Sequence, residues 1–129
     1  MRPGQFNVTS IPLVKYRGSR PAVLLDVRPA VAAEARGLSF RYAASTGSGA
    51  HIGLARGWKP QVWALRPLRG FEIRPGESAA VVIGATAGRN GIYLVHSFVV
   101  SYRVGGTHYR TRYRVGIKTC IGTGPSCPN

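Results

Sequence analysis

The fold is decided by one stretch of the chain, residues 92–118, which reads IYLVHSFVVSYRVGGTHYRTRYRVGIK. Its even-numbered positions are mostly apolar as far as Val104, and such alternation is typical of a strand with one buried face. Gly105 and Gly106 follow, and two residues that tolerate positive φ form a strong two-residue hairpin turn. The stretch therefore predicts a β-hairpin whose return strand runs from Thr107 to Lys118.

The turn also predicts the register of this hairpin. A two-residue loop places Val104 opposite Thr107, and Tyr102 then lies opposite Tyr109. The apolar faces of two independently patterned strands coincide in this register, which supports the pairing. Continued along both strands, the register turns His96 inward, where we expect a core or rim histidine rather than a catalytic one.

The opposite face of the hairpin is basic. Arg110, Arg112 and Arg114 occupy alternate positions of the return strand at spacings of about 7 Å, and Arg103 and Lys118 extend the row. Like charges at this spacing repel, so we expect the face to lie in water or against an anion. These five residues are the predicted partner-binding site. The neighbouring tyrosines alternate onto the other face, whereas a stacking platform for nucleic acid needs them beside the basic residues.

The whole chain is strongly basic. It has 129 residues with 18 Lys and Arg, 4 Asp and Glu, and a formal net charge of +14. Arg binds carboxylates and phosphates through a planar fork, so the charge favours an anionic partner. We expect an acidic protein, a glycan or an envelope polymer, with nucleic acid as the alternative. An Arg-rich composition also arises from a GC-rich coding sequence, in which case the arginines form a solvated face.

The rest of the chain reads as short strands separated by Gly and Pro. Strands are expected at residues 6–9, 11–16, 22–28, 38–42, 52–55, 61–65, 70–74 and 78–85. The last of these contains a continuous apolar run that is typical of a strand covered on both faces. Only Val31–Arg36 is compatible with a helical turn. We predict one all-β domain over residues 1–119, followed by a Cys-containing tail at residues 120–129.

Three motifs lie in the second half of the chain: Arg74–Ile83 with its Pro-Gly-Glu turn, Gly91–Tyr93, and Val99–Tyr109 with the Gly-Gly hairpin. Together, over residues 70–119, they resemble the C-terminal half of immunoglobulin-like β-sandwich modules of bacterial extracytoplasmic proteins. The resemblance implies an antiparallel immunoglobulin-like sandwich of about seven to nine strands, with Tyr93 as a tyrosine corner whose hydroxyl bonds back to the backbone. The hairpin register instead places Tyr93 on the polar face, unless a bulge intervenes.

Both cysteines, Cys120 and Cys127, lie near the end of the chain, separated by the turn-forming residues Ile-Gly-Thr-Gly-Pro-Ser. We expect a disulfide between them, which would contribute roughly 2–3 kcal/mol in the loop-entropy account. It would also imply an oxidising compartment, and two free thiols are the alternative. No histidine has metal-like spacing with the cysteines.

The sequence offers little for catalysis. Four acidic residues leave almost no supply for paired-carboxylate enzymes, and no nucleophile elbow, phosphate-binding loop or dinucleotide fingerprint occurs. We therefore expect no catalytic residue, no cofactor and no metal. No apolar run is long enough to span a membrane. No signal peptide is visible, which leaves both a cytoplasmic protein and a mature or excised domain open.

These observations predict a non-catalytic structural or binding module of an exported, cell-surface, appendage or virion assembly. The alternative is a cytoplasmic nucleic-acid-binding protein, and an enzyme ranks third. Extended strands also leave open self-assembly by edge-strand addition, with the N-terminal stretch Phe6–Tyr16 as the candidate donor.

Overall fold

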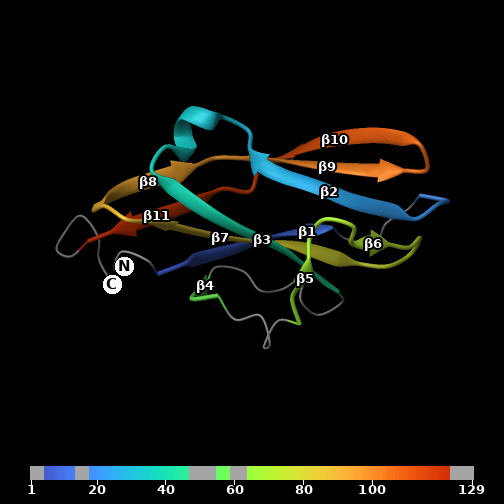
Figure 1. The fold of residues 1–129 in the computed structure, drawn as a ribbon, viewed down its shortest axis with the longest axis horizontal. Helices are drawn as coiled ribbons and strands as arrows, with labels where there is room; N and C mark the ends of the chain where they lie inside the picture. The colour runs from blue at the N-terminus through green and yellow to red at the C-terminus, as the bar shows by residue number, and fades with distance from the viewer. Residues whose placement is uncertain (1–4, 14–17, 47–54, 59–63, 123–129) are drawn as a thin grey trace.

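The computed structural model describes residues 5–13, 18–46, 55–58 and 64–122, whose regular structure is almost all β-strand (Figure 1). Eleven strands lie within these ranges: β1 (Asn7–Leu13), β2 (Ala22–Pro29), β3 (Leu38–Thr46), β4 (Ala55–Arg56), β5 (Arg66–Pro67), β6 (Glu72–Ile73), β7 (Ala79–Ala87), β8 (Gly91–Val95), β9 (Phe98–Val104), β10 (Thr107–Tyr113) and β11 (Ile117–Ile121). Their number exceeds the seven to nine expected, because β4, β5 and β6 have only two residues each. Among the described residues one 3-10 turn is present, η1 (Ala32–Ala35), and it occupies the stretch that the sequence allowed to be helical.

The strands form three antiparallel sheets within the described residues. A five-stranded sheet has the order β4-β1-β7-β3-β5, a four-stranded sheet has the order β10-β9-β2-β6, and β11 pairs with β8. In Figure 1 the strands β2, β9 and β10 of the four-stranded sheet lie above the β1, β3 and β7 layer. The predicted all-β antiparallel architecture is confirmed, and the arrangement is that of a β-sandwich.

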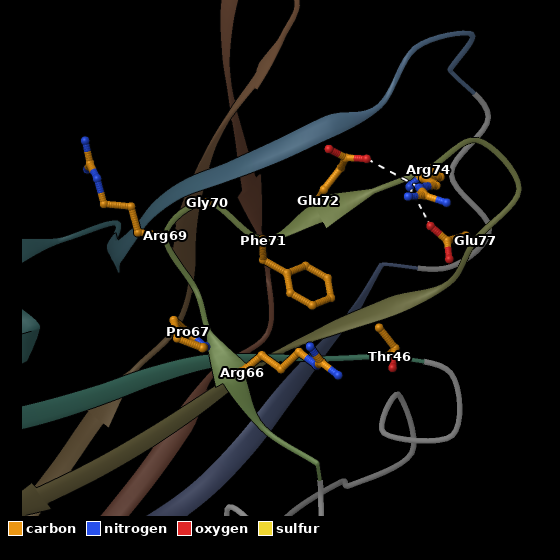
Figure 2. Close-up of a pocket in the computed structure, with 9 residues that line it drawn as sticks. All are labelled: Thr46, Arg66, Pro67, Arg69, Gly70, Phe71, Glu72, Arg74 and Glu77. Atoms are coloured by element: carbon orange, nitrogen blue, oxygen red, sulfur yellow. Dashed lines mark hydrogen bonds and ion pairs between the residues drawn. The ribbon is translucent and has the colours of Figure 1, made fainter.

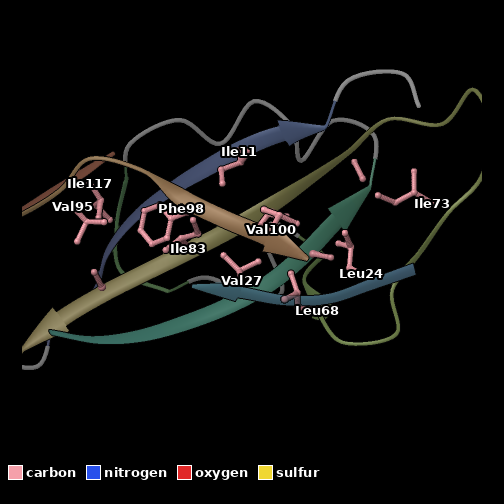
Figure 3. Close-up of a cluster of buried hydrophobic side chains, with 14 residues drawn as sticks. Ile11, Leu24, Val27, Leu68, Ile73, Ile83, Val95, Phe98, Val100 and Ile117 are labelled. Carbon is pink, nitrogen blue, oxygen red and sulfur yellow. The ribbon is translucent and has the colours of Figure 1, made fainter. Parts of the chain in front are cut away.

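The hydrophobic core lies between the two large sheets (Figure 3). Side chains alternate between the two faces of a strand, so every second residue points inward. The largest buried members are Phe98, Ile11, Leu24, Ile83 and Ile117. The Phe98 ring meets the Phe40 ring edge-on, with 5.9 Å between centroids. Phe40 lies on β3, and together with Leu38 and Tyr42 of the same strand it packs against the core.

The outer side of the five-stranded sheet is also covered, at least around β7. All but one of the residues of this central strand are buried, as its continuous apolar sequence predicts. A Cβ built on Gly84 would lie 2.8 Å from Cε3 of Trp58 and 3.0 Å from Cδ1 of Phe6. Glycine at this position therefore lets two aromatic rings lie directly on the strand, and the Arg41 guanidinium lies 4.9 Å from the centroid of the Phe6 ring.

The hairpin at Gly105-Gly106 has the predicted register from the turn as far as the pair Phe98–Tyr113. Beyond that pair the prediction is wrong, because β8 and β9 are separate strands in different sheets. In the β8–β11 ladder Ile117 lies opposite Val95, whereas the continued register placed it opposite Leu94.

The break has a geometric cause at the junction of the two ladders. Three residues of the return chain, 114–116, face two residues of the outgoing chain, 96–97, so the return chain carries one extra residue. A Cβ built on Gly116 would lie only 2.6 Å from the carbonyl oxygen of Val95. The two chains approach here at a distance that only glycine permits.

The break reverses which side chains of β8 point inward. Ile92 and Leu94, expected on the apolar face, are 56% and 44% exposed. The His96 side chain, expected to point inward, is 65% exposed. Tyr93 lies on the covered side instead, and its hydroxyl donates a hydrogen bond to the carbonyl oxygen of Arg89 at 3.1 Å. The bulge that the sequence left open is present, and it removes the conflict over Tyr93.

Both ends of the described chain differ from expectation. β1, which holds most of the predicted donor stretch Phe6–Tyr16, pairs along its whole length with β7 and is part of the five-stranded sheet. β11 extends to Ile121, so Cys120, assigned from the sequence to the tail, lies in a strand. Cys120 is disulfide-bonded, and Cys127, its predicted partner, lies outside the described residues, as do most of the strands predicted at 52–55 and 61–65.

Candidate functional site

The outer face of the four-stranded sheet collects basic side chains from three adjacent strands. Across β10, β9 and β2 the register aligns three rows: His108–Arg103–Val23, Arg110–Ser101–Asp26 and Arg112–Val99–Arg28. Neighbouring strands lie about 4.7–4.9 Å apart, so charges within and between these rows act on one another. We call Arg28, Arg103, His108, Arg110 and Arg112 the basic face.

Asp26 is the one acidic residue in these rows. Its Oδ2 accepts hydrogen bonds from Nη2 of Arg28 at 2.8 Å and from Nε of Arg28 at 3.1 Å. The Arg28 and Asp26 side chains are 68% and 45% exposed, so solvent screens the pair. Asp26 therefore forms its ion pair with Arg28 on its own strand, and it offsets little of the positive charge on β9 and β10.

The other arginines of the basic face have weak or neutral partners. Nη1 of Arg103 donates to the carbonyl oxygen of Gly105 in the turn at 3.2 Å. Nε of Arg112 donates to Oγ of Ser97 at 3.0 Å. Arg110 is exposed and makes no hydrogen bond or ion pair with the described residues. None of these three guanidinium groups forms an ion pair with a carboxylate of the described residues, although Arg112 lies near enough to Glu34 to lower its pKa.

None of the four acidic side chains is free to balance these arginines. All four acidic side chains lie among the described residues, and each has a partner nearby. The four contacts are Asp26–Arg28, Glu34–His96, Glu72–Arg74 and Glu77 with the N–H of Arg74. The excess positive charge of the basic face must therefore be met by solvent ions or by an external anion.

The structure brings together only part of the predicted site. Arg103, Arg110 and Arg112 share one face, but Arg114 follows the end of β10 as an exposed residue. The placement of Lys118 is wrong: it lies on β11 in the two-stranded sheet, where its carbonyl oxygen accepts a hydrogen bond from Nδ2 of Asn7 at 2.6 Å.

Sequence reasoning missed Arg28, which the structure adds to the basic face. The pairing of β2 with β9 shifts between Leu24 and Asp26, so Leu25 is an extra residue. Leu24 and Val27 are both buried, and this change of phase turns Asp26 and Arg28 outward. The unbroken alternation of residues 22–28 would have placed Arg28 in the core. The available signal in the sequence was the pair of adjacent apolar residues Leu24 and Leu25, which strict alternation does not explain.

The tyrosines lie on the opposite face from the arginines, as predicted. The rings of Tyr102 and Tyr109 stack with centroids 5.4 Å apart and planes at 18°. Tyr109 remains 45% exposed because β10 is at the margin of the sheet. Tyr113 lies deeper, and its burial, with a smaller effect of Tyr102, raises the pKa of the phenol. The basic face itself thus has no aromatic ring on which bases could stack.

A second cluster joins η1 to the junction of β8 and β9. Oε2 of Glu34 lies 2.5 Å from Nδ1 of His96, and Oε1 accepts a hydrogen bond from the backbone N–H of His96 at 3.2 Å. These hydrogen bonds lower the pKa of Glu34, and the charge of Arg112 lowers it further. The neighbouring Ser97 hydroxyl is buried and accepts from Arg112, so it is held by a guanidinium rather than by the imidazole.

A cavity of about 600 Å³ lies beside β6, at the other margin of the four-stranded sheet (Figure 2). Figure 2 shows the Phe71 ring between Arg66 and Glu72. Nε of Arg74 lies 3.4 Å from Oε1 of Glu72, and the Arg74 N–H donates to Oε1 of Glu77 at 2.8 Å. Because both positive and negative side chains line this cavity, it attracts an anion less strongly than the basic face does.

Comparison of the sequence with known protein families and with curated proteins finds no match. Among the described residues, none of the helical segments is long and apolar enough to cross a bilayer.

Proposed function

We propose that the protein is a non-catalytic structural or binding module that holds an anionic partner on its basic face. The observation that carries the proposal is the grouping of Arg103, Arg110 and Arg112 on one side of a sheet. The one carboxylate in the same rows, that of Asp26, is already bound by Arg28. An acidic protein, a glycan or an envelope polymer fits this surface through charge-assisted hydrogen bonds to guanidinium groups.

We also propose that the sandwich is an immunoglobulin-like module and that it works outside the cytoplasm, in a secreted, cell-surface, appendage or virion assembly. The Tyr93 hydroxyl bonds to the backbone four residues upstream, which is the contact that the tyrosine corner of such modules makes. The disulfide at Cys120 also supports the extracytoplasmic location, because disulfides persist in oxidising compartments.

The test measures binding to heparin, duplex DNA and polyglutamate as a function of salt. The variant Arg110→Ser/Arg112→Ser removes two charges from the basic face. The matched control Arg66→Ser/Arg69→Ser removes two charges from exposed arginines that form no ion pair with the described residues. Loss of two phosphate contacts should lower the slope of log K against log salt for duplex DNA by about 1.8, whereas the control should change it less.

Three results would contradict the proposal. If both double variants weaken polyanion binding equally, the net charge of the protein attracts polyanions and the basic face has no special role. Binding to duplex DNA far tighter than to heparin or polyglutamate at equal salt would favour the nucleic-acid-binding alternative. A hydrolase activity that disappears in His96→Gln would overturn the non-catalytic assignment.

A further inference from the structure

The strand β10 has an open edge. Within the part of the chain that the structure describes, β10 pairs only with β9, and no strand lies on its other side. The strand is seven residues long and lies at the margin of the upper sheet in Figure 1. An edge of this length can accept an extended peptide as an additional strand.

The hairpin turn determines which backbone groups reach this edge. In a two-residue turn the carbonyl of Val104 accepts a hydrogen bond from the N–H of Thr107, so Thr107 directs its backbone groups toward β9. The direction alternates along an antiparallel strand. The N–H and C=O groups of His108, Arg110 and Arg112 therefore point to the open edge.

The same three residues carry the basic side chains of the edge. His108, Arg110 and Arg112 are all exposed on the outer face. On the inner face Tyr109 is 45% exposed and lies flat against Tyr102. A strand added here would meet positive charge on one side and an aromatic ring on the other.

We propose that β10 docks an extended acidic segment of a partner protein as an additional strand. Acidic side chains at alternate positions would face Arg110 and Arg112, and apolar side chains between them would cover Tyr109. A second copy of this chain is a poor occupant, because pairing two β10 strands edge to edge would bring their basic side chains together. The inference rests on the function proposed above and assigns it a partner class and a binding mode.

The probe is a short synthetic peptide in which Glu alternates with Val, titrated against the protein by calorimetry. A control peptide has the same composition in two blocks, all Glu followed by all Val. A second control keeps the alternation but carries N-methyl groups at every second residue, on the amides that would face β10. If strand addition is correct, the alternating peptide binds at least about tenfold more tightly than either control, because two or more backbone hydrogen bonds are at stake.

A protein variant provides the complementary test. His108→Pro removes an N–H from the open edge, where proline is tolerated, and leaves the bonds to β9 and both arginines intact. It should lower the affinity for the alternating peptide about tenfold and leave heparin retention unchanged. Arg110→Ser/Arg112→Ser should weaken the binding of both the peptide and heparin. The N-methylated peptide needs no protein substitution, so it decides the question even where the proline variant folds poorly.

Strand addition is overturned if the alternating, block and N-methylated peptides bind equally. If the peptides bind equally but Arg110→Ser/Arg112→Ser still weakens the binding of heparin, the proposed function remains supported. If Arg110→Ser/Arg112→Ser changes neither the binding of the peptide nor the binding of heparin, the proposed function is overturned as well. Self-association of the wild type that disappears in His108→Pro would also overturn the proposal, in favour of a second copy as the occupant.

Discussion

The break between β8 and β9 predicts an inversion in the cost of two neighbouring alanine substitutions. Leucine is the larger residue, and the continuous register would place Leu94 in the core. In the structure Val95 has no exposed surface, whereas Leu94 is 44% exposed. We therefore expect Val95→Ala to destabilise the protein more than Leu94→Ala.

The magnitudes follow from the surface that each substitution removes. Val95→Ala deletes two fully buried methyl groups, worth about 0.8 kcal/mol each, and leaves a closed cavity that raises the total cost to roughly 2–2.5 kcal/mol. Leu94→Ala deletes one more carbon, but nearly half of the side chain is already in water and no closed cavity forms. Its cost should be about 1 kcal/mol.

Urea unfolding monitored by circular dichroism measures both values, provided that the m-values of the variants match that of the wild type. A second pair of variants widens the difference, because a lysine at 94 can extend into solvent whereas a lysine at 95 would bury an unpaired charge. If Leu94→Ala costs more than Val95→Ala, the strand is continuous through His96 and the register break is wrong.

Three further predictions concern single positions. Gly116→Ala should destabilise by at least about 1–3 kcal/mol in urea unfolding, because its Cβ would press on the carbonyl oxygen of Val95, which is backbone and cannot turn away. Thr119→Val should raise stability by about 1 kcal/mol, since the buried Thr119 hydroxyl has no hydrogen-bond partner among the described residues. Glu34→Gln should flatten the loss of stability in acid. The hydrogen bonds to His96 lower the Glu34 pKa from 4.5, so its stabilisation is present above that pH and is lost as the pH falls through the lowered value. A wild type and a Glu34→Gln variant whose urea midpoints fall equally on acidification would contradict this.

Much of the architecture could be predicted from local sequence. The Gly-Gly turn fixes the pairing of the residues beside it, because two adjacent glycines allow a tight hairpin and the period of a strand is two. The apolar run of β7 predicted a strand covered on both faces, since no polar residue interrupts it. The separation of tyrosines from arginines on β10 also followed from alternation alone.

What the sequence could not determine is where alternation changes phase. At the junction of the two ladders Val95 and Phe98 are both buried, which exposes Leu94 and covers Tyr93, and the extra residue Leu25 turns Arg28 outward. Each change depends on how a strand fits a partner that is distant in the chain, which is a property of tertiary packing rather than of local pattern.

The sequence by itself therefore determined an all-β fold, the hairpin and an unbalanced positive charge. Only the tertiary structure decided which of those charges meet. It added Arg28 to Arg103, Arg110 and Arg112 and assigned Lys118 to a different sheet. The physical reason is that a shift of one residue turns every following side chain of a strand to the other face. The local sequence allows such a shift at several positions, and pairing with the partner strands determines which position is used.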